Sequence, residues 1–136
     1  ITFHGAVSHD RLGDFYSRAD IFTFPSLYEG FGIVLAEAMH AGLAIVAART
    51  GSANEIVSES ENALIVPPAD SAALAGAIRL LATDADLRKN FGRRSRELAG
   101  SLPTWKRTCD SICDQIEIMS RRTHGMKQTT RPIPRR

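Results

Sequence analysis

Short apolar runs alternate with segments of helical pattern along most of the chain, and this alternation constrains the fold more than any other feature. The runs that predict strands occupy residues 1–4, 21–25, 44–48 and 63–66. The segments that predict helices occupy residues 9–18, 32–40, 53–57, 71–81 and 85–98. Strands that alternate with helices favour a parallel sheet with helices on both faces. We therefore expect an α/β domain.

Residues that begin or end helices support these boundaries. Gly42 follows the second predicted helix, where a C-terminal glycine is common. Asp70 or Ser71 can cap the helix at 71–81, and Asp84 can cap the next one. A last helix is predicted at 104–122. Its apolar residues recur at a spacing that indicates one packed stripe, namely Trp105, Ile112, Ile116 and Met119.

Two carboxylates, Glu29 and Glu37, lie on either side of a glycine-bearing loop that opens the helix at 32–40. Gly30 and Gly32 let the backbone take unusual conformations and let a ligand come close. Free N–H groups and the positive dipole end of the helix favour an anion there. Glu37 lies about 7 Å along the helix from Gly32, so its carboxylate can reach vicinal hydroxyls bonded to that anion. Glu29 could hold a second hydroxyl-rich group, so the pattern predicts a site for a phosphorylated, hydroxyl-rich ligand.

A purely structural interpretation competes with this one. Glu37 would then be a helix carboxylate near a favourable dipole end, and Glu29 a solvated loop residue. The rest of the helix is apolar on nearly every face, through Ile33, Val34, Leu35, Ala36, Ala38, Met39 and Ala41. This composition predicts a buried helix, and a buried carboxylate needs partners. The ligand interpretation is therefore favoured.

The run from Glu29 to Gly42, EGFGIVLAEAMHAG, resembles the E-x(7)-E segment of retaining, nucleotide-sugar-dependent glycosyltransferases with the GT-B fold. This family, glycosyl transferases group 1, includes glycogen and sucrose synthases and bacterial mannosyltransferases. Further similar stretches follow in order at residues 3–7, 19–20, 24–26, 44–47, 51–57 and 62–68. The resemblance covers about residues 1–107. It implies part of the Rossmann-like, donor-binding C-terminal domain of a GT-B enzyme, truncated at its N-terminus.

The resemblance also implies roles for individual residues. Glu37 would bind the ribose hydroxyls of the donor nucleotide, and Glu29 would face the donor sugar as the candidate catalytic residue. The donor diphosphate would be held around the loop and helix start, at Gly30, Phe31, Gly32, Ile33 and Val34. The nucleobase would lie against Gly5, Ala6 and Val7. The domain would then stabilise the departing nucleoside diphosphate during a hexosyl transfer of EC 2.4 type. Its substrate would be a UDP- or GDP-sugar, with no cofactor and no metal.

The departures from the family pattern are equally informative. The strand at 1–4 would lie midway through the family's C-terminal domain. The preceding strands, the basic residues on the donor phosphates and the N-terminal acceptor domain would be missing. We expect one partial domain at 1–107, a helix at 104–122, and a chain that is inactive alone. In relatives the last helix crosses back toward the N-terminal domain, so here we expect an exposed apolar surface.

The formal charge of +2 conceals an asymmetry between body and tail. Residues 121–136 hold six basic residues and no acidic one, which leaves 11 of the 17 basic and all 15 acidic residues in the body, a net charge of −4. A basic groove for nucleic acid is not supported. The tail at 123–136 is expected to be disordered. It has either a weak attraction to an anionic membrane surface or no role, and the second interpretation is favoured.

The expected location follows from what the sequence lacks. No apolar run is long enough to span a bilayer, and no secretory signal is recognisable. We expect a cytoplasmic protein, peripheral at the inner membrane face if its acceptor is a lipid. A polysaccharide is the other acceptor that the resemblance suggests.

Several other residues imitate functional motifs. Asp84-Ala-Asp86 resembles a D-x-D metal motif, but a helix follows it and capping is favoured. Cys109 and Cys113 share a helix face without a second ligating pair, so reduced, packed thiols are expected. Two roles remain open for Glu55. It has a structural role at the start of the helix at 53–57, or it faces a ligand.

Two alternatives to a glycosyltransferase remain open. A GT-B-like nucleotide-sugar epimerase would need acid and base residues in its own N-terminal half. A non-catalytic remnant or interaction module would keep the fold and lose the reaction. Upstream sequence separates the first from a transferase, and titration with nucleoside diphosphates separates the second.

Overall fold

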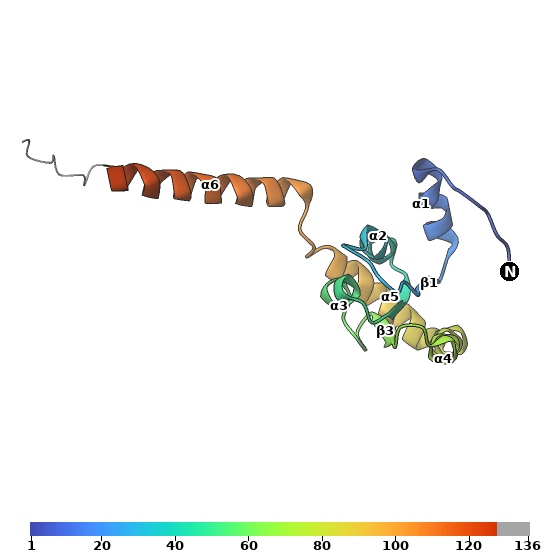
Figure 1. Ribbon diagram of the computed structural model, residues 1–136. Coiled ribbons are helices and arrows are strands. Elements are labelled where there is room, and N and C mark those ends of the chain that lie inside the picture. Colours follow the sequence, from blue (N-terminus) through green and yellow to red (C-terminus); the bar gives the residue numbers. More distant parts are fainter. Residues whose placement is uncertain (128–136) are drawn as a thin grey trace, which may run out of the picture. The chain divides into compact units, whose positions relative to one another are not determined.

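The computed structural model describes residues 1–127 of the chain as two compact units, divided after Leu102 (Figure 1). The first unit contains three strands, β1 (Ile21–Phe24), β2 (Ala44–Ala48) and β3 (Ala63–Val66). Its helices are α1 (His9–Arg18), α2 (Ile33–Ala41), α3 (Gly51–Ile56), α4 (Ser71–Thr83) and α5 (Ala85–Ala99). The second unit contains α6 (Trp105–Lys127). Within residues 1–127, no helix is both long and apolar enough to cross a membrane.

The three strands form a parallel sheet in the order β1-β2-β3, as predicted. Ile21 pairs with Ala44, and Ile45 pairs with Ala63. All five residues of β2 are buried, because this central strand is covered on both faces. Its continuous apolar run is the pattern expected of a strand inside a parallel sheet. The α/β architecture is thus confirmed.

The strand predicted at residues 1–4 is wrong. Ile1 and Phe3 are 114% and 92% exposed, and the segment pairs with no strand in the described part of the chain. A β-strand needs a neighbour for its backbone N–H and C=O groups. Among residues 1–127, β1 pairs with β2 alone, so no ladder is formed with the N-terminal segment. An apolar run in the sequence does not show whether a neighbouring strand is present to pair with it.

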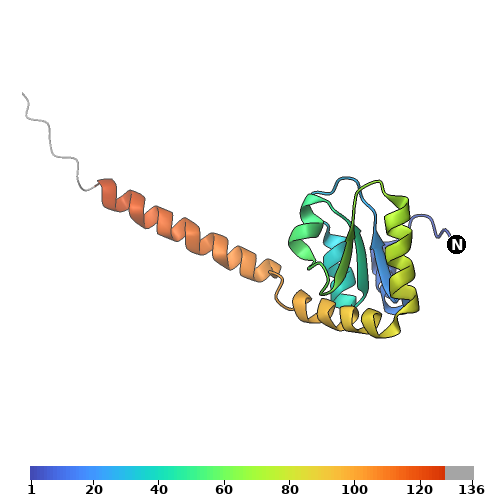
Figure 2. The same cartoon turned by 90° about the horizontal axis from the view of Figure 1, so that it is seen from below.

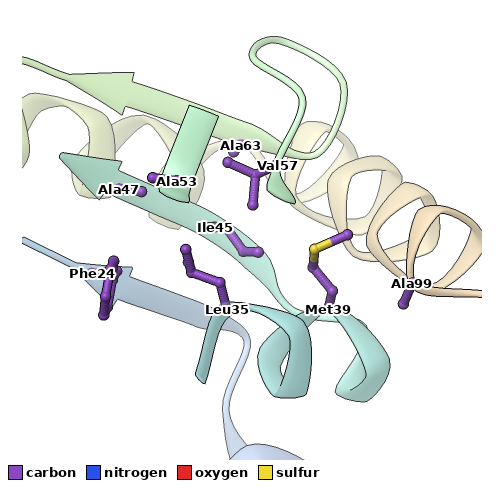
Figure 3. Packing of buried hydrophobic residues seen from close by; sticks show 9 residues of the cluster. All are labelled: Phe24, Leu35, Met39, Ile45, Ala47, Ala53, Val57, Ala63 and Ala99. Carbon is purple, nitrogen blue, oxygen red and sulfur yellow. The ribbon is translucent and has the colours of Figure 1, made fainter. Parts of the chain in front are cut away.

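Helices cover both faces of the sheet (Figure 2). On one face, Leu35 and Met39 of α2 meet Ile45 of β2, with Ala53 and Val57 beside them (Figure 3). On the other face, a second cluster holds Ala44, Val46, Val66, Leu81 and Phe91. Alternate residues of β2 therefore enter opposite cores, as the two-residue period of a strand requires.

The helix ends follow the predicted signals. Asp70 accepts a hydrogen bond from the Ala73 N–H at 2.8 Å, and Asp84 accepts one from the Leu87 N–H at 2.8 Å. Gly42 closes α2 at φ +79°, a conformation that disfavours a side chain. Its backbone also meets α5 closely: a Cβ on Gly92 would collide with the Gly42 carbonyl oxygen. The turn after α2 thus depends on two glycines.

A buried polar network, which we call the amino-edge clamp, joins Leu43, Asn62 and Ser95. The Ser95 hydroxyl donates to the Leu43 carbonyl at 2.7 Å, and the Asn62 amide donates to the Ser95 oxygen at 3.2 Å. Asn62 and Ser95 are 0% exposed, and the Asn62 oxygen accepts the Ser58 N–H at 2.8 Å. Leu43 and Asn62 immediately precede β2 and β3. The clamp therefore links the amino ends of two strands to α5.

Helix α6 carries the predicted apolar stripe, but the stripe is exposed. Trp105, Ile112 and Ile116 are 83%, 54% and 61% exposed. Within its own unit, the stripe packs against no other described helix or strand. The helix continues to Lys127, past the predicted end at 122, so residues 123–127 are helical. The rest of the predicted tail lies outside the described residues.

Candidate functional site

The loop between the two glutamates lies at the carboxyl end of β1. β1 ends at Phe24 and α2 begins at Ile33, so residues 25–32 connect them. Because β1 and β2 are parallel, the connection from β2 to α3 leaves the same edge of the sheet. Open parallel sheets bind ligands in crevices outside the carboxyl ends of their strands. The predicted site therefore stands at the edge that this architecture uses.

Gly32 sets the start of α2. It has φ +73° and ψ +46°, in the left-handed region that favours glycine. No side chain caps this helix end. The Leu35 N–H donates to the Gly32 carbonyl at 2.8 Å, but the N–H groups of Ile33 and Val34 have no backbone acceptor among residues 1–127. They are therefore available to an anion, with the positive end of the helix dipole behind them.

Helix α2 is fully buried along one face and half-buried or exposed elsewhere, so the prediction of a buried helix holds for that face. Leu35, Ala38 and Met39 are 0% exposed. Ile33 is 63% exposed and Val34 is half-buried. The reason is geometric, because one helix can meet the sheet and its neighbours along a single stripe. The exposed side faces out beside the loop, where Tyr28 and Phe31 are 89% and 65% exposed.

Glu29 folds back on its own loop. Its Oε1 accepts a hydrogen bond from the Gly30 N–H at 3.1 Å, and the residue is half-buried. This contact holds the carboxylate close to the loop backbone. It leaves the second oxygen with no hydrogen bond among residues 1–127. The carboxylate thus keeps acceptor capacity for a hydroxyl-rich group.

Glu37 meets a partner that sequence reasoning missed. The Tyr16 hydroxyl of α1 donates to Glu37 Oε2 at 2.9 Å. Burial, the hydrogen bond to Glu37 and the charge of Glu37 together raise the pKa of Tyr16 to about 12, with burial the largest cause. A phenol that donates to a carboxylate resists ionisation because a second negative charge would arise beside the first. The half-buried Glu37 is therefore satisfied on one oxygen.

The raised pKa of Tyr16 predicts how the chain responds to alkaline pH. In a Tyr28→Phe variant, Tyr16 is the single tyrosine. At pH 11 it should be only about 10% ionised by absorbance at 295 nm, against about 90% for a free phenol. The stabilisation is fully present below about pH 10 and is lost as the pH rises toward about 12. Unfolding in urea at pH 11 should restore ionisation; a phenol already ionised in the folded chain would contradict the contact.

The segment predicted to meet a nucleobase lies beside α1. Gly5 has φ +65°, Gly5 and Ala6 are exposed, and Val7 is half-buried. Val7 lines an apolar groove of about 290 Å³ together with Tyr16 and Phe22. Tyr16 therefore borders both this segment and Glu37. No hydrogen bond in the described residues joins residues 5–7 to the loop at 25–32.

The family follows from a comparison with known proteins. A model of the family described as glycosyl transferases group 1 matches residues 1–98. The chain belongs to this family. D-inositol 3-phosphate glycosyltransferase from Saccharomonospora viridis is 35% identical over 103 residues, which cover 76% of this chain and 24% of that protein.

Solved structures give the same result. Sucrose-phosphate synthase from Thermosynechococcus elongatus matches with a TM-score of 0.74 and 34% identity, over 92% of this chain and 30% of that one. Anabaena HepE in complex with UDP matches with a TM-score of 0.71 and 25% identity, over 76% of this chain and 29% of that one. The fold is thus that of GT-B glycosyltransferases. This group 1 glycosyltransferase chain spans about a fifth to a third of the curated relatives it matches.

In this group 1 glycosyltransferase chain, the structure corrects the role expected for Glu55 and reveals a buried hydroxyl at Thr50. Glu55 is exposed and lies near the end of α3, because the helix begins at Gly51 rather than at residue 53. A role at the helix start is therefore wrong. No sequence pattern points to Thr50, which lies just before α3. It is 8% exposed, and its hydroxyl has no hydrogen-bond partner among residues 1–127.

Of the residues that imitated metal motifs, Asp84 has a structural role in this family member. Asp84 caps α5, which is the role favoured over a metal motif from the sequence. Within residues 1–127, no three or more His, Cys, Asp or Glu side chains are grouped to hold a metal ion. Both cysteines are free, with Cys109 half-buried and Cys113 exposed. Cys113 is therefore not the packed thiol that was expected.

Proposed function

We propose that this chain binds the donor of a retaining glycosyltransferase that transfers a hexose from a nucleotide sugar to an acceptor. The observation that carries the proposal is the uncapped start of α2 at the left-handed Gly32, flanked by Glu29 and Glu37 at the carboxyl edge of a parallel sheet. Backbone donors for a diphosphate and carboxylates for hydroxyl groups are the two chemistries that such a donor requires.

Each group has a proposed role in this site. The backbone from Gly30 to Val34 holds the diphosphate, and Glu37 accepts from the ribose hydroxyls. Glu29 faces the donor sugar, and the segment at residues 5–7 lies against the base. As the glycosidic bond breaks, negative charge grows on the departing nucleoside diphosphate. N–H groups already aimed at that charge stabilise the transition state without reorganisation.

The acceptor is proposed to bind to an N-terminal domain that relatives carry and that lies outside this sequence. We propose that the chain alone binds donor and does not transfer sugar. A lipid or a polysaccharide is the proposed acceptor, and with a lipid the reaction would take place at the inner face of the membrane in the cytoplasm. The base is uridine or guanosine; the UDP bound by HepE supports uridine.

Isothermal titration of the 136-residue chain with UDP, GDP, UDP-glucose and GDP-mannose tests the proposal. We expect saturable binding of one nucleotide series and no detectable turnover when a donor is incubated with candidate acceptors. AMP, which has one phosphate, serves as the control and should bind more weakly. Absence of binding by every nucleotide would contradict donor recognition and favour a non-catalytic interaction module. Robust sugar transfer by the chain alone would contradict the proposal that it binds donor without transferring sugar.

A further inference from the structure

Tyr16 connects two parts of the proposed site that are far apart in sequence. It lies on α1, and its hydroxyl donates to Glu37 on α2 at 2.9 Å. Its ring lies 5.9 Å from the ring of Phe22 on β1, in a tilted arrangement. The same ring borders the groove that Val7 lines. The phenol is therefore fixed from the strand side and directed at one carboxylate.

The hydrogen bond occupies only part of the capacity of Glu37. A carboxylate offers about four lone-pair positions on two oxygens. Tyr16 uses one position on Oε2, and no hydrogen bond to Oε1 occurs among residues 1–127. A pair of vicinal hydroxyls can therefore bind the remaining positions while Tyr16 stays in place. Without the phenol, the glutamate side chain would have to be ordered at the moment of binding, which weakens affinity.

We propose that Tyr16 is a positioning residue for ribose recognition: its hydroxyl holds the Glu37 carboxylate so that the free oxygen faces the ribose hydroxyls. This inference rests on the proposed donor site. The raised pKa of Tyr16 fits the role, since the phenol stays protonated and donates at any physiological pH. The ribose contact is made by Glu37, and Tyr16 acts through it.

The test compares Tyr16→Phe with the parent chain against two probes, UDP and 2′,3′-dideoxy-UDP. We expect the variant to bind UDP about 3- to 10-fold more weakly, the effect of losing one preordered side chain. Binding of the dideoxy nucleotide, which lacks the hydroxyls, should not change. Ser17→Ala is the matched control, because it also removes a hydroxyl from α1, one that donates to the Asp14 carbonyl of the same helix. It should leave both affinities unchanged. GDP and its dideoxy form replace the probes if the parent chain binds guanosine.

The outcomes separate this inference from the proposed function. If the parent chain binds no nucleotide, the proposed function fails, and the positioning role fails with it. If the parent binds UDP more tightly than the dideoxy form but Tyr16→Phe changes neither affinity, only the positioning role fails. Equal weakening of both probes would indicate a merely structural role. Tighter binding of UDP would show that Tyr16 competes with the ribose.

A second measurement does not depend on whether the Tyr16→Phe variant folds. In the Tyr28→Phe chain at pH 11, Tyr16 should stay protonated when the nucleotide is saturating, because it keeps its bond to Glu37. Ionisation on addition of nucleotide would show that the ligand displaces the phenol, and this would overturn the proposal.

Discussion

Replacing Gly92 with alanine is expected to lower the free energy of unfolding by about 1 to 3 kcal/mol, the usual cost of forcing extra volume into a packed site. Gly92 is buried on α5, and a Cβ there would collide with the carbonyl oxygen of Gly42. The obstacle is backbone at the end of α2, so no side-chain rotation can relieve it. Either α5 or the turn at Gly42 has to move. Urea denaturation followed by circular dichroism measures the loss.

The matched control is Gly76→Ala, which should have the opposite sign. Gly76 is exposed in the interior of α4, and a Cβ there meets nothing within 4 Å. Alanine should therefore stabilise the chain by about 0.5 to 1 kcal/mol through lower backbone entropy in the unfolded state. If both variants were stabilised, the close contact between α5 and the turn after α2 would be disproved.

Replacing Glu37 with alanine is expected to weaken nucleoside diphosphate binding by about 1.5 to 3 kcal/mol, the range for hydrogen bonds to a charged group. This corresponds to a roughly 10- to 150-fold increase in Kd. The physical reason is that two ribose hydroxyls lose one common acceptor, and the Tyr16 hydroxyl loses its partner as well. Isothermal titration with the preferred nucleotide measures the effect.

Glu117→Ala is the control for this experiment, because it removes an exposed helix carboxylate from α6, in the other unit of the chain. Its nucleotide affinity should equal that of the parent. Unfolding curves for both variants establish that each chain is folded under the titration conditions. An unchanged affinity in a folded Glu37→Ala chain would refute the ribose contact and leave Glu37 with only its bond to Tyr16.

Local sequence signals were sufficient for most of the fold. The bounds of β2, β3 and α1 follow from apolar runs and helical spacing alone, since burial on both faces leaves a continuous apolar pattern. The segment at 1–4 has the same pattern and forms no strand. The difference lies in its neighbours, because pairing depends on which strand lies alongside. Composition does not contain that information.

The strand-loop-helix unit that carries the candidate site was predictable, because it depends on the local chain. Gly32, Glu29 and Glu37 stand on one strand-loop-helix unit, whose geometry follows from consecutive residues. Tyr16 was not predictable, because its contact with Glu37 depends on how α1 packs beside α2. The buried hydroxyl of Thr50 likewise becomes apparent only when the elements around the carboxyl edge are assembled. Helical periodicity predicts faces but not what lies against them.

The amino-edge clamp has a consequence for how such a domain can diverge. Its buried bonds tie Ser95 of α5 to Leu43 and Asn62, at the ends of the strands opposite to the loop at 25–32. The bonds that hold the layers together and the loop of the proposed donor site therefore lie at opposite ends of the same sheet. Substitutions in that loop leave the three residues of the clamp and their buried bonds untouched. A domain built in this way can vary its loop while the bonds between its layers are kept.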